Sequence, residues 1–147
     1  MSPAQPSSET VHATCVVIDG RGVLILGPSG AGKSDLALRL IDRGATLVSD
    51  DGVEVSNEGD RILARAPRTI AGQMEVRGLG IVTMPALDEA PVALCISLTA
   101  PRDRMPPDPL PTTPIAAREI PTLALDPFEA SAPIKVERGL ALYGLPA

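Results

Sequence analysis

Apolar and polar positions along the chain follow two different periods, and the change between them marks the first elements. Residues 11–18 form a run rich in β-branched side chains, and residues 23–26 are fully apolar, which favours two strands, the second in the middle of a sheet. Residues 19–22 between them are a turn signal, so the two strands are expected to form a hairpin. From Leu36 the apolar positions adopt a helical spacing that ends at Gly44, where a C-cap glycine is expected.

The rest of the chain is patterned mainly as strands. Short apolar runs predict them at residues 45–48, 53–55, 61–66, 80–84, 92–98 and, more weakly, 123–125. Residues 101–114 carry six prolines and predict a stiff, extended loop. Residues 134–143 predict a short final helix, although Gly139 weakens the pattern. The pattern therefore predicts an α/β or α+β fold with more strand than helix.

Composition narrows the class of protein. The 147 residues suit one domain, expected over 11–147 after a flexible lead-in of Ser, Pro and Gln at 1–10. A net charge of −5 and only two aromatic residues argue against a nucleic-acid partner. No apolar run is long enough to span a bilayer, and the first residues lack a secretory signal, so we expect a cytoplasmic protein without a membrane partner.

The two cysteines are expected to be structural. Cys15 and Cys95 lie in apolar contexts, with no second thiol or histidine at a metal-site spacing. The sequence therefore predicts two buried small hydrophobic residues rather than a disulfide or metal ligands.

The chemistry begins at a phosphate-binding loop, because residues 27–34 match the Walker A pattern G-x-x-x-x-G-K-[ST]. Its glycines let successive backbone N–H groups point at an anion, and the following helix adds the positive end of its dipole. Lys33 can reach the outer phosphates, and the Ser34 hydroxyl can bind Mg²⁺. The nucleotide-binding residues predicted by this match are Gly27, Pro28, Ser29, Gly30, Ala31, Gly32, Lys33 and Ser34.

Two adjacent carboxylates follow the P-loop in the sequence. Asp50 and Asp51 come after the strand that succeeds the P-loop helix, so we expect them at the same sheet edge as the phosphates. One could bind a metal ion while the other accepts a proton from an attacking hydroxyl. Because adjacent strand residues point to opposite faces, separate roles are expected. The alternative is an Asp-Asp-Gly turn that only closes a hairpin.

Three other polar residues carry little signal from pattern alone. His12 is the single histidine of the chain, and a lone histidine at the start of a strand is more often without a catalytic role. Glu75 and Arg77 lie in the segment Met-Glu-Val-Arg-Gly-Leu-Gly, which is typical of a solvated, charged loop.

Taken together, these segments resemble the catalytic domain of HPr kinase/phosphorylase, an enzyme that phosphorylates a serine on the phosphocarrier HPr. The match rests on His12, residues 27–51 and the stretch Glu-Val-Arg-Gly-Leu-Gly-Ile at 75–81, which is similar to the family signature. Residues 133–138 add a weaker match. The resemblance covers about residues 11–140 and implies a short form without the N-terminal regulatory domain of most members.

The resemblance implies a fold and an activity. The fold would be an α/β P-loop-containing kinase core, strand-rich, with a short C-terminal helix. The activity would be that of an ATP- and Mg²⁺-dependent protein serine kinase of the phosphotransferase system, with HPr or an HPr-like protein as partner. The same site would run phosphorolysis, in which inorganic phosphate attacks phosphoserine and pyrophosphate is released. The family also implies a homo-oligomer, a hexamer.

Site residues follow from the resemblance position by position. The catalytic residues that it implies are His12, Lys33, Asp51 and Arg104, the last as the best match to an arginine in the loop after a core strand. Ser34 and Glu75 would lie on the metal side, with Asp50 as an outer contributor.

One departure and two other function classes stay open at this point. Glu137 stands where the family usually has glycine, in a segment linked to dephosphorylation. A small-molecule kinase, in which Asp51 activates a metabolite hydroxyl, fits the same motifs. A non-catalytic nucleotide sensor fits the P-loop alone, and the presence of both His12 and Asp51 argues against it.

Overall fold

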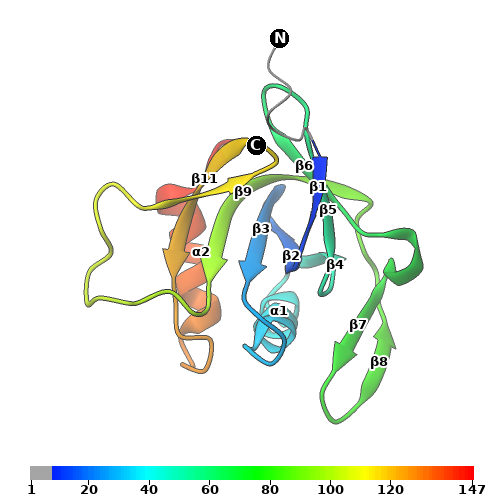
Figure 1. The fold of residues 1–147 in the computed structure, drawn as a ribbon. Coiled ribbons are helices and arrows are strands. Elements are labelled where there is room, and N and C mark those ends of the chain that lie inside the picture. Colours follow the sequence, from blue (N-terminus) through cyan, green and yellow to red (C-terminus); the bar gives the residue numbers. More distant parts are fainter. Residues whose placement is uncertain (1–7) are drawn as a thin grey trace.

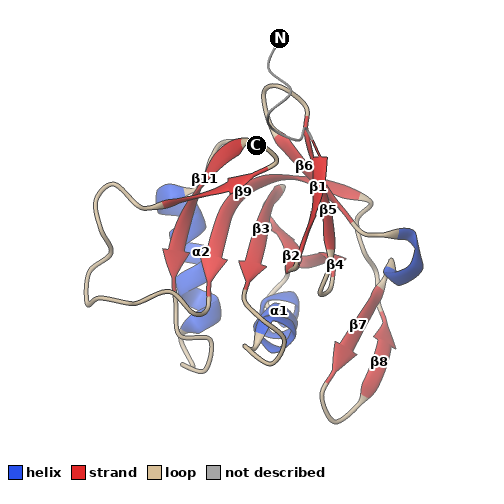
Figure 2. Cartoon of the chain, in the orientation of Figure 1, coloured by secondary structure: helices blue, strands red, loops and turns tan. Residues whose placement is uncertain are grey.

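The computed structural model describes residues 8–147, and strands outnumber helices, as the sequence predicts (Figure 2). The strands are β1 (Ser8–Val11), β2 (Ala13–Ile18), β3 (Arg21–Leu26), β4 (Thr46–Ser49), β5 (Val53–Asn57), β6 (Ile62–Arg65), β7 (Gln73–Val76), β8 (Gly80–Thr83), β9 (Glu89–Ser97), β10 (Thr112–Ile115) and β11 (Arg118–Ala124). The helices are α1 (Lys33–Asp42) and α2 (Ala132–Tyr143), with a single 3-10 turn at Arg68–Ile70. No helix within residues 8–147 is long and apolar enough to cross a membrane.

The main sheet has nine strands, and β3 lies in its middle, as its apolar sequence predicts. Seven strands follow the order β1-β5-β6-β9-β3-β2-β4, while β11 pairs with β9 and β10 pairs with β11 (Figure 1). Strands β7 and β8 form a separate hairpin. Because β9 runs parallel to both β3 and β11, and β2 runs antiparallel to both β3 and β4, these four strands, β3, β4, β9 and β11, share one direction.

The predicted hairpin between the first apolar runs forms, with a tighter turn than the sequence suggests. Strands β2 and β3 pair from Ala13 opposite Leu26 to Ile18 opposite Arg21, which leaves only Asp19 and Gly20 in the turn. Both have positive φ, +50° and +79°, the requirement of a two-residue type I′ turn. The register of the hairpin is therefore fixed, and it puts the end of β3 beside the start of β2.

Hydrophobic residues are buried on both faces of the sheet. One face packs against the helices, with Leu36 and Leu40 of α1 buried at the predicted helical spacing and Val136 and Leu140 of α2 buried beside them. The other face forms a second cluster with side chains of β5, β6, β10 and β11, so the sheet covers this face itself. Burial of apolar surface on two sides holds the strands in place, and this fixes the positions at which the loops begin and end.

Helix α2 lies close to the sheet because of Gly139. A Cβ at this buried position would lie 2.6 Å from Cδ2 of Leu123 on β11, so glycine has a packing reason within an otherwise regular helix. Glu137, on the same helix, accepts two hydrogen bonds of 3.0 and 2.8 Å from Arg43 at the end of α1. This hydrogen-bonded contact raises the pKa of the Arg43 guanidinium and links the two helices.

Three sequence predictions need correction. Residues 1–10 are expected as a flexible lead-in, but Ser8–Val11 pair with β5, while residues 1–7 lie outside the described residues. The extended loop predicted over 101–114 ends earlier, because Thr112–Ile115 pair with β11. The segment with Glu75 and Arg77 is exposed, as predicted, but Glu75 lies on strand β7 and Arg77 in the turn of the β7–β8 hairpin. The partner of β1 lies far away in the sequence, and the partner of β10 has a weak pattern of its own, so local sequence gives no signal for these two strands.

Cys15 and Cys95 are free thiols in the core, as predicted. Both register with Leu24 of β3, one from each neighbouring strand. Burial is the main cause that raises the pKa of each thiol to about 12.

We expect both thiols to resist modification in the folded protein. With a pKa of about 12, only about one thiol in ten thousand is ionised at pH 8, and the thiolate is the reactive form. Titration with a colourless aromatic disulfide reagent should detect no fast-reacting thiol in buffer and two in concentrated guanidinium chloride. Rapid reaction of either cysteine in buffer would show that the β2–β3–β9 centre is open to solvent.

Candidate functional site

Four loops leave the sheet at one edge. Because β3, β4, β9 and β11 are parallel, their carboxyl ends lie together, and β2, which runs the other way, begins there (Figure 1). This edge therefore gathers the predicted P-loop after β3, Asp50 and Asp51 after β4, and His12 just before β2. Ligands of α/β sheets bind at this kind of edge.

The segment 27–32 connects β3 to α1 in a conformation suited to an anion. Gly30 and Gly32 have φ of +85° and +104°, values that other residues rarely adopt, and the N–H of Ala31 donates to the carbonyl of Pro28 at 3.1 Å. Gly32 is the N-cap of α1 and offers no side-chain cap. The first N–H groups of α1 thus have no side-chain acceptor at the cap, and an anion can accept from them.

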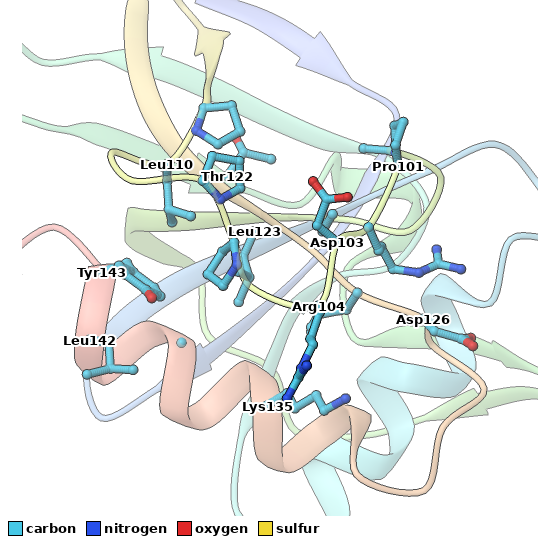
Figure 3. Close-up of a pocket in the computed structure, with 18 of the residues that line it drawn as sticks. Pro101, Asp103, Arg104, Leu110, Thr122, Leu123, Asp126, Lys135, Leu142 and Tyr143 are labelled. Carbon is cyan, nitrogen blue, oxygen red and sulfur yellow. The ribbon is translucent and has the colours of Figure 1, made fainter.

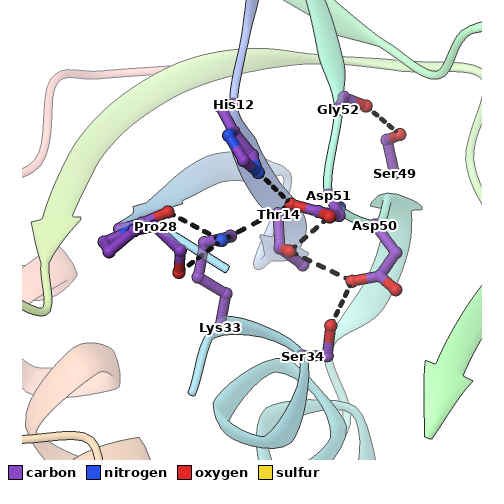
Figure 4. A network of polar contacts seen from close by, with 10 residues as sticks. His12, Thr14, Pro28, Lys33, Ser34, Ser49, Asp50, Asp51 and Gly52 are labelled. Atoms are coloured by element: carbon purple, nitrogen blue, oxygen red, sulfur yellow. Dashed lines mark hydrogen bonds and ion pairs between the residues drawn. The ribbon is translucent and has the colours of Figure 1, made fainter. Parts of the chain in front are cut away.

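Lys33 lies at the centre of the edge, with its side chain only 5% exposed. Its ammonium donates to the carbonyl oxygens of Gly27 at 2.7 Å and Pro28 at 3.1 Å, and lies 3.4 Å from Oδ1 of Asp51 (Figure 4). The ammonium has three donors, and here they serve the loop and one carboxylate. The positive charge is therefore held over the P-loop and next to Asp51.

Asp51 presents a carboxylate between two donors. Nε2 of His12 lies 2.6 Å from Oδ1 of Asp51, and because an ionised carboxylate only accepts, the histidine must carry its proton on Nε2 (Figure 4). Asp51 has φ +53°, a left-handed conformation that costs energy for a non-glycine residue, and its N–H donates to Oγ1 of Thr14 at 3.1 Å. Within residues 8–147 no hydrogen bond or ion pair engages Oδ2, and the side chain is 47% exposed. Asp51 thus has one oxygen anchored and one available.

Asp50 differs from Asp51, because its carboxylate is buried and both of its oxygens accept hydrogen bonds. Oδ1 accepts from Oγ1 of Thr14 at 3.1 Å and from Oγ of Ser34 at 2.6 Å. Oδ2 accepts from the backbone N–H of Glu75 at 3.0 Å. The two aspartates occupy different environments, with Asp50 joining β2, α1 and β7, but the cause is not strand alternation, because β4 ends at Ser49 and Asp51 has a left-handed backbone.

Thr14 is the residue that sequence analysis missed. It is fully buried on β2, and its hydroxyl donates to Asp50 while it accepts from the N–H of Asp51. A signal existed, because Thr14 is the one hydroxyl within the apolar run of β2.

Two predicted site residues do not reach this cluster. Glu75 contacts it only through its backbone, and its side chain is exposed on β7. Arg104 lines a pocket of about 630 Å³ between the proline-rich loop and α2, together with Lys135 and Arg138 (Figure 3). No hydrogen bond or ion pair in the described part of the chain joins Arg104 to His12, Lys33 or Asp51.

A magnesium site fits the polar pair beside the P-loop. Among residues 8–147 no group of three or more His, Cys, Asp or Glu side chains could hold a metal ion. Mg²⁺ commonly takes only one or two protein oxygens, with phosphates and water completing its shell. The Ser34 hydroxyl can supply one such oxygen, because its proton is donated to Asp50 at 2.6 Å and its lone pairs are left for a metal ion.

Comparison with known proteins gives consistent matches. Residues 5–118 match the family model of the HPr Serine kinase C-terminal domain. The HPr kinase/phosphorylase of Clostridium beijerinckii is 44% identical over 77 residues, which are 52% of this chain and 26% of that protein. The HPr kinase/phosphorylase of Halalkalibacterium halodurans is 45% identical over 96 residues, or 60% of this chain and 31% of that protein. The chain thus spans less than a third of the length of these curated relatives.

A solved structure is similar over almost the whole chain. The Hpr(Ser) kinase/phosphatase from Coxiella burnetii superposes with a TM-score of 0.78 at 31% sequence identity. The match covers 91% of this chain and 89% of the other.

Replacing Thr14 by Val should destabilise the site and the fold together. Val keeps the shape but leaves the N–H of Asp51 without its acceptor and takes one donor from a buried carboxylate, a loss of about 1–3 kcal/mol. Urea unfolding measures the change, and Thr14→Ser, which retains the hydroxyl, should recover most of it. Equal stability of the Val and Ser variants would contradict this role.

Proposed function

The chain belongs to the HPr Serine kinase C-terminal domain family, and from this we propose that it is a protein serine kinase that uses ATP and Mg²⁺. The protein substrate is HPr or an HPr-like phosphocarrier, and the same site runs phosphate-dependent dephosphorylation of the phosphoserine. The observation that carries the proposal is the position of Asp51, which is held between His12 and Lys33 where the P-loop leaves the sheet.

The P-loop supplies the binding of the phosphates. Backbone N–H groups of residues 30–33 and the uncapped start of α1 hold the β- and γ-phosphates of ATP. Lys33 neutralises charge on the transferred group by exchanging a loop carbonyl for a phosphate oxygen. Its burial supports this role, because a cation in a site with little water stabilises developing charge strongly.

Asp51 supplies the proton transfer. In the kinase direction its free Oδ2 accepts the proton of the serine hydroxyl while that oxygen attacks the γ-phosphorus and ADP departs. His12 acts through Asp51, because it holds Oδ1 and so turns Oδ2 toward the substrate. The backbone N–H of Asp51 donates a hydrogen bond to Thr14, and this bond keeps Asp51 in the left-handed conformation. The carboxylate is therefore oriented before the substrate arrives.

Ser34 is the side chain that would hold Mg²⁺ directly, with Asp50 as an outer contributor. The metal ion, when bound, adds positive charge next to the phosphates. Ser34 provides a hydroxyl at the start of α1, and Asp50 orients that hydroxyl through its hydrogen bond of 2.6 Å. Glu75 remains a proposed metal-side residue. Its backbone N–H donates to Asp50, so its side chain begins next to the proposed metal site.

The reverse reaction uses the same groups. Asp51 takes the proton of inorganic phosphate while an oxygen of that phosphate attacks the phosphorus of phosphoserine. The bond to the serine oxygen then breaks, and Asp51 returns the proton to that oxygen. The product pyrophosphate then occupies the P-loop as the β- and γ-phosphates of ATP do. Glu137, the departure from the family pattern, is engaged with Arg43 at the far end of α1.

Two further parts of the proposal, the role of Arg104 and the oligomeric state, rest on the family resemblance. Arg104 would stabilise charge in the transition state, which requires its loop to approach the P-loop, because in the structure it lines the pocket beside α2. The family supports a homo-oligomer with six copies.

Incubation with HPr and γ-labelled ATP tests the function. We expect label on a serine of HPr, and we expect Lys33→Ala to reduce the rate by about 10²–10³-fold because it removes the buried cation. HPr with that serine replaced by Ala is the matched control. Label on free metabolites but not on HPr would favour a small-molecule kinase, and ATP binding without transfer would favour a sensor.

Replacing Asp51 by Asn should stop both directions, because Asn keeps the shape but cannot accept a proton. Transfer to HPr and pyrophosphate release from phosphoserine-HPr should both be lost, with ATP affinity roughly retained. Asp50→Asn should instead shift the Mg²⁺ dependence. If Asp50→Asn is the more damaging variant at saturating Mg²⁺, the roles of the two aspartates are reversed.

A further inference from the structure

An exposed aromatic ring lies against the P-loop. Phe128, the only phenylalanine, is 75% exposed in the connection between β11 and α2. A Cβ built on Gly32, the last glycine of the P-loop, would lie 3.6 Å from Cε1 of Phe128 and 3.4 Å from the ring of Pro127. The ring therefore stands next to the start of α1, with most of its surface in water.

The connection that carries Phe128 is fixed on α1 by hydrogen bonds. The guanidinium of Arg39 donates to the carbonyl oxygens of Pro127 and Glu129. The N–H of Phe128 itself donates to Oδ1 of Asp126 at 2.9 Å. These bonds hold the backbone on both sides of Phe128, so the exposure of its ring is a property of an ordered segment.

The sheet order gives the direction in which a bound nucleotide extends. Asp51 follows β4, which is separated from β3 by β2, so the phosphate to be transferred lies toward the β2–β4 side of the P-loop. Strands β9 and β11 lie on the other side of β3, and Phe128 follows β11 (Figure 1). A nucleotide with its last phosphate at Asp51 therefore carries its nucleoside toward Phe128.

We propose that Phe128 is the stacking surface for the nucleobase, which deepens the proposed function and rests on it. An aromatic ring binds the flat face of a base, and stacking of this kind is insensitive to the identity of the base. Tyr143, the only other aromatic residue, lies at the end of α2 and lines the pocket beside the proline-rich loop, so it makes a natural control.

Calorimetry with ATP and with inorganic tripolyphosphate, each with Mg²⁺, separates base from phosphate binding. Phe128→Ala should weaken ATP binding by about tenfold to a hundredfold and leave tripolyphosphate binding unchanged, because only ATP has a base. Phe128→Tyr should retain the wild-type ATP affinity, and so should Tyr143→Ala. Unchanged ATP affinity in Phe128→Ala, or an equal loss for both ligands, would overturn the proposal. Failure of the wild type to bind either ligand would instead overturn the proposed function.

Fluorescence gives an independent measurement, because the chain contains no tryptophan. The emission of the Phe128→Trp variant should change on addition of ATP and stay constant with tripolyphosphate. The Tyr143→Trp variant should respond to neither ligand. Equal responses of Phe128→Trp to ATP and tripolyphosphate would show that the base does not reach this ring.

Discussion

The buried carboxylate of Asp50 must accept hydrogen bonds on both oxygens, and much of the site is arranged around this need. A charge with so little contact with water is tolerated only when donors surround it. The donors come from three separate elements: Thr14 on β2, Ser34 at the start of α1 and the backbone of Glu75 on β7. One buried charge therefore fixes how the P-loop helix, the strand beginning beside His12 and the β7–β8 hairpin sit relative to one another.

The neighbouring aspartate uses this framework without sharing its burial. Thr14 connects the two, since its hydroxyl donates to the side chain of Asp50 and accepts from the backbone of Asp51. Asp51 can therefore adopt a left-handed backbone and keep its carboxylate half exposed. Asp51 is thus exposed for reaction, while Asp50 is buried and supports the structure around it. The backbone strain at Asp51 is compensated by the contacts around Thr14.

The sequence predicted those features that depend on local order. The helical spacing from Leu36 and the apolar run of β3 predict the P-loop's surroundings. Strand alternation does not explain the different environments of Asp50 and Asp51, because both residues follow the end of β4. It could not predict β1, whose partner β5 lies some forty residues further on. It also could not place Arg104, which lines a pocket together with residues of α2 that lie far away in the sequence. Thr14 was missed because its partners, Asp50 and Asp51, follow β4, and only the folded sheet brings them to β2.

The position of β3 in the sheet also determines when each of its two edges can pair during synthesis of the chain. The β2–β3 hairpin, α1 and β4 are consecutive, so one side of β3 can pair as soon as it is made. On its other side β3 pairs with β9, which begins at Glu89, 63 residues after β3 ends at Leu26. During synthesis, this apolar strand therefore has an unpaired edge while half of the chain is still missing, which is the situation that invites aggregation and the attention of chaperones. The strand that holds the P-loop is thus among the first to form and among the last to be sheltered.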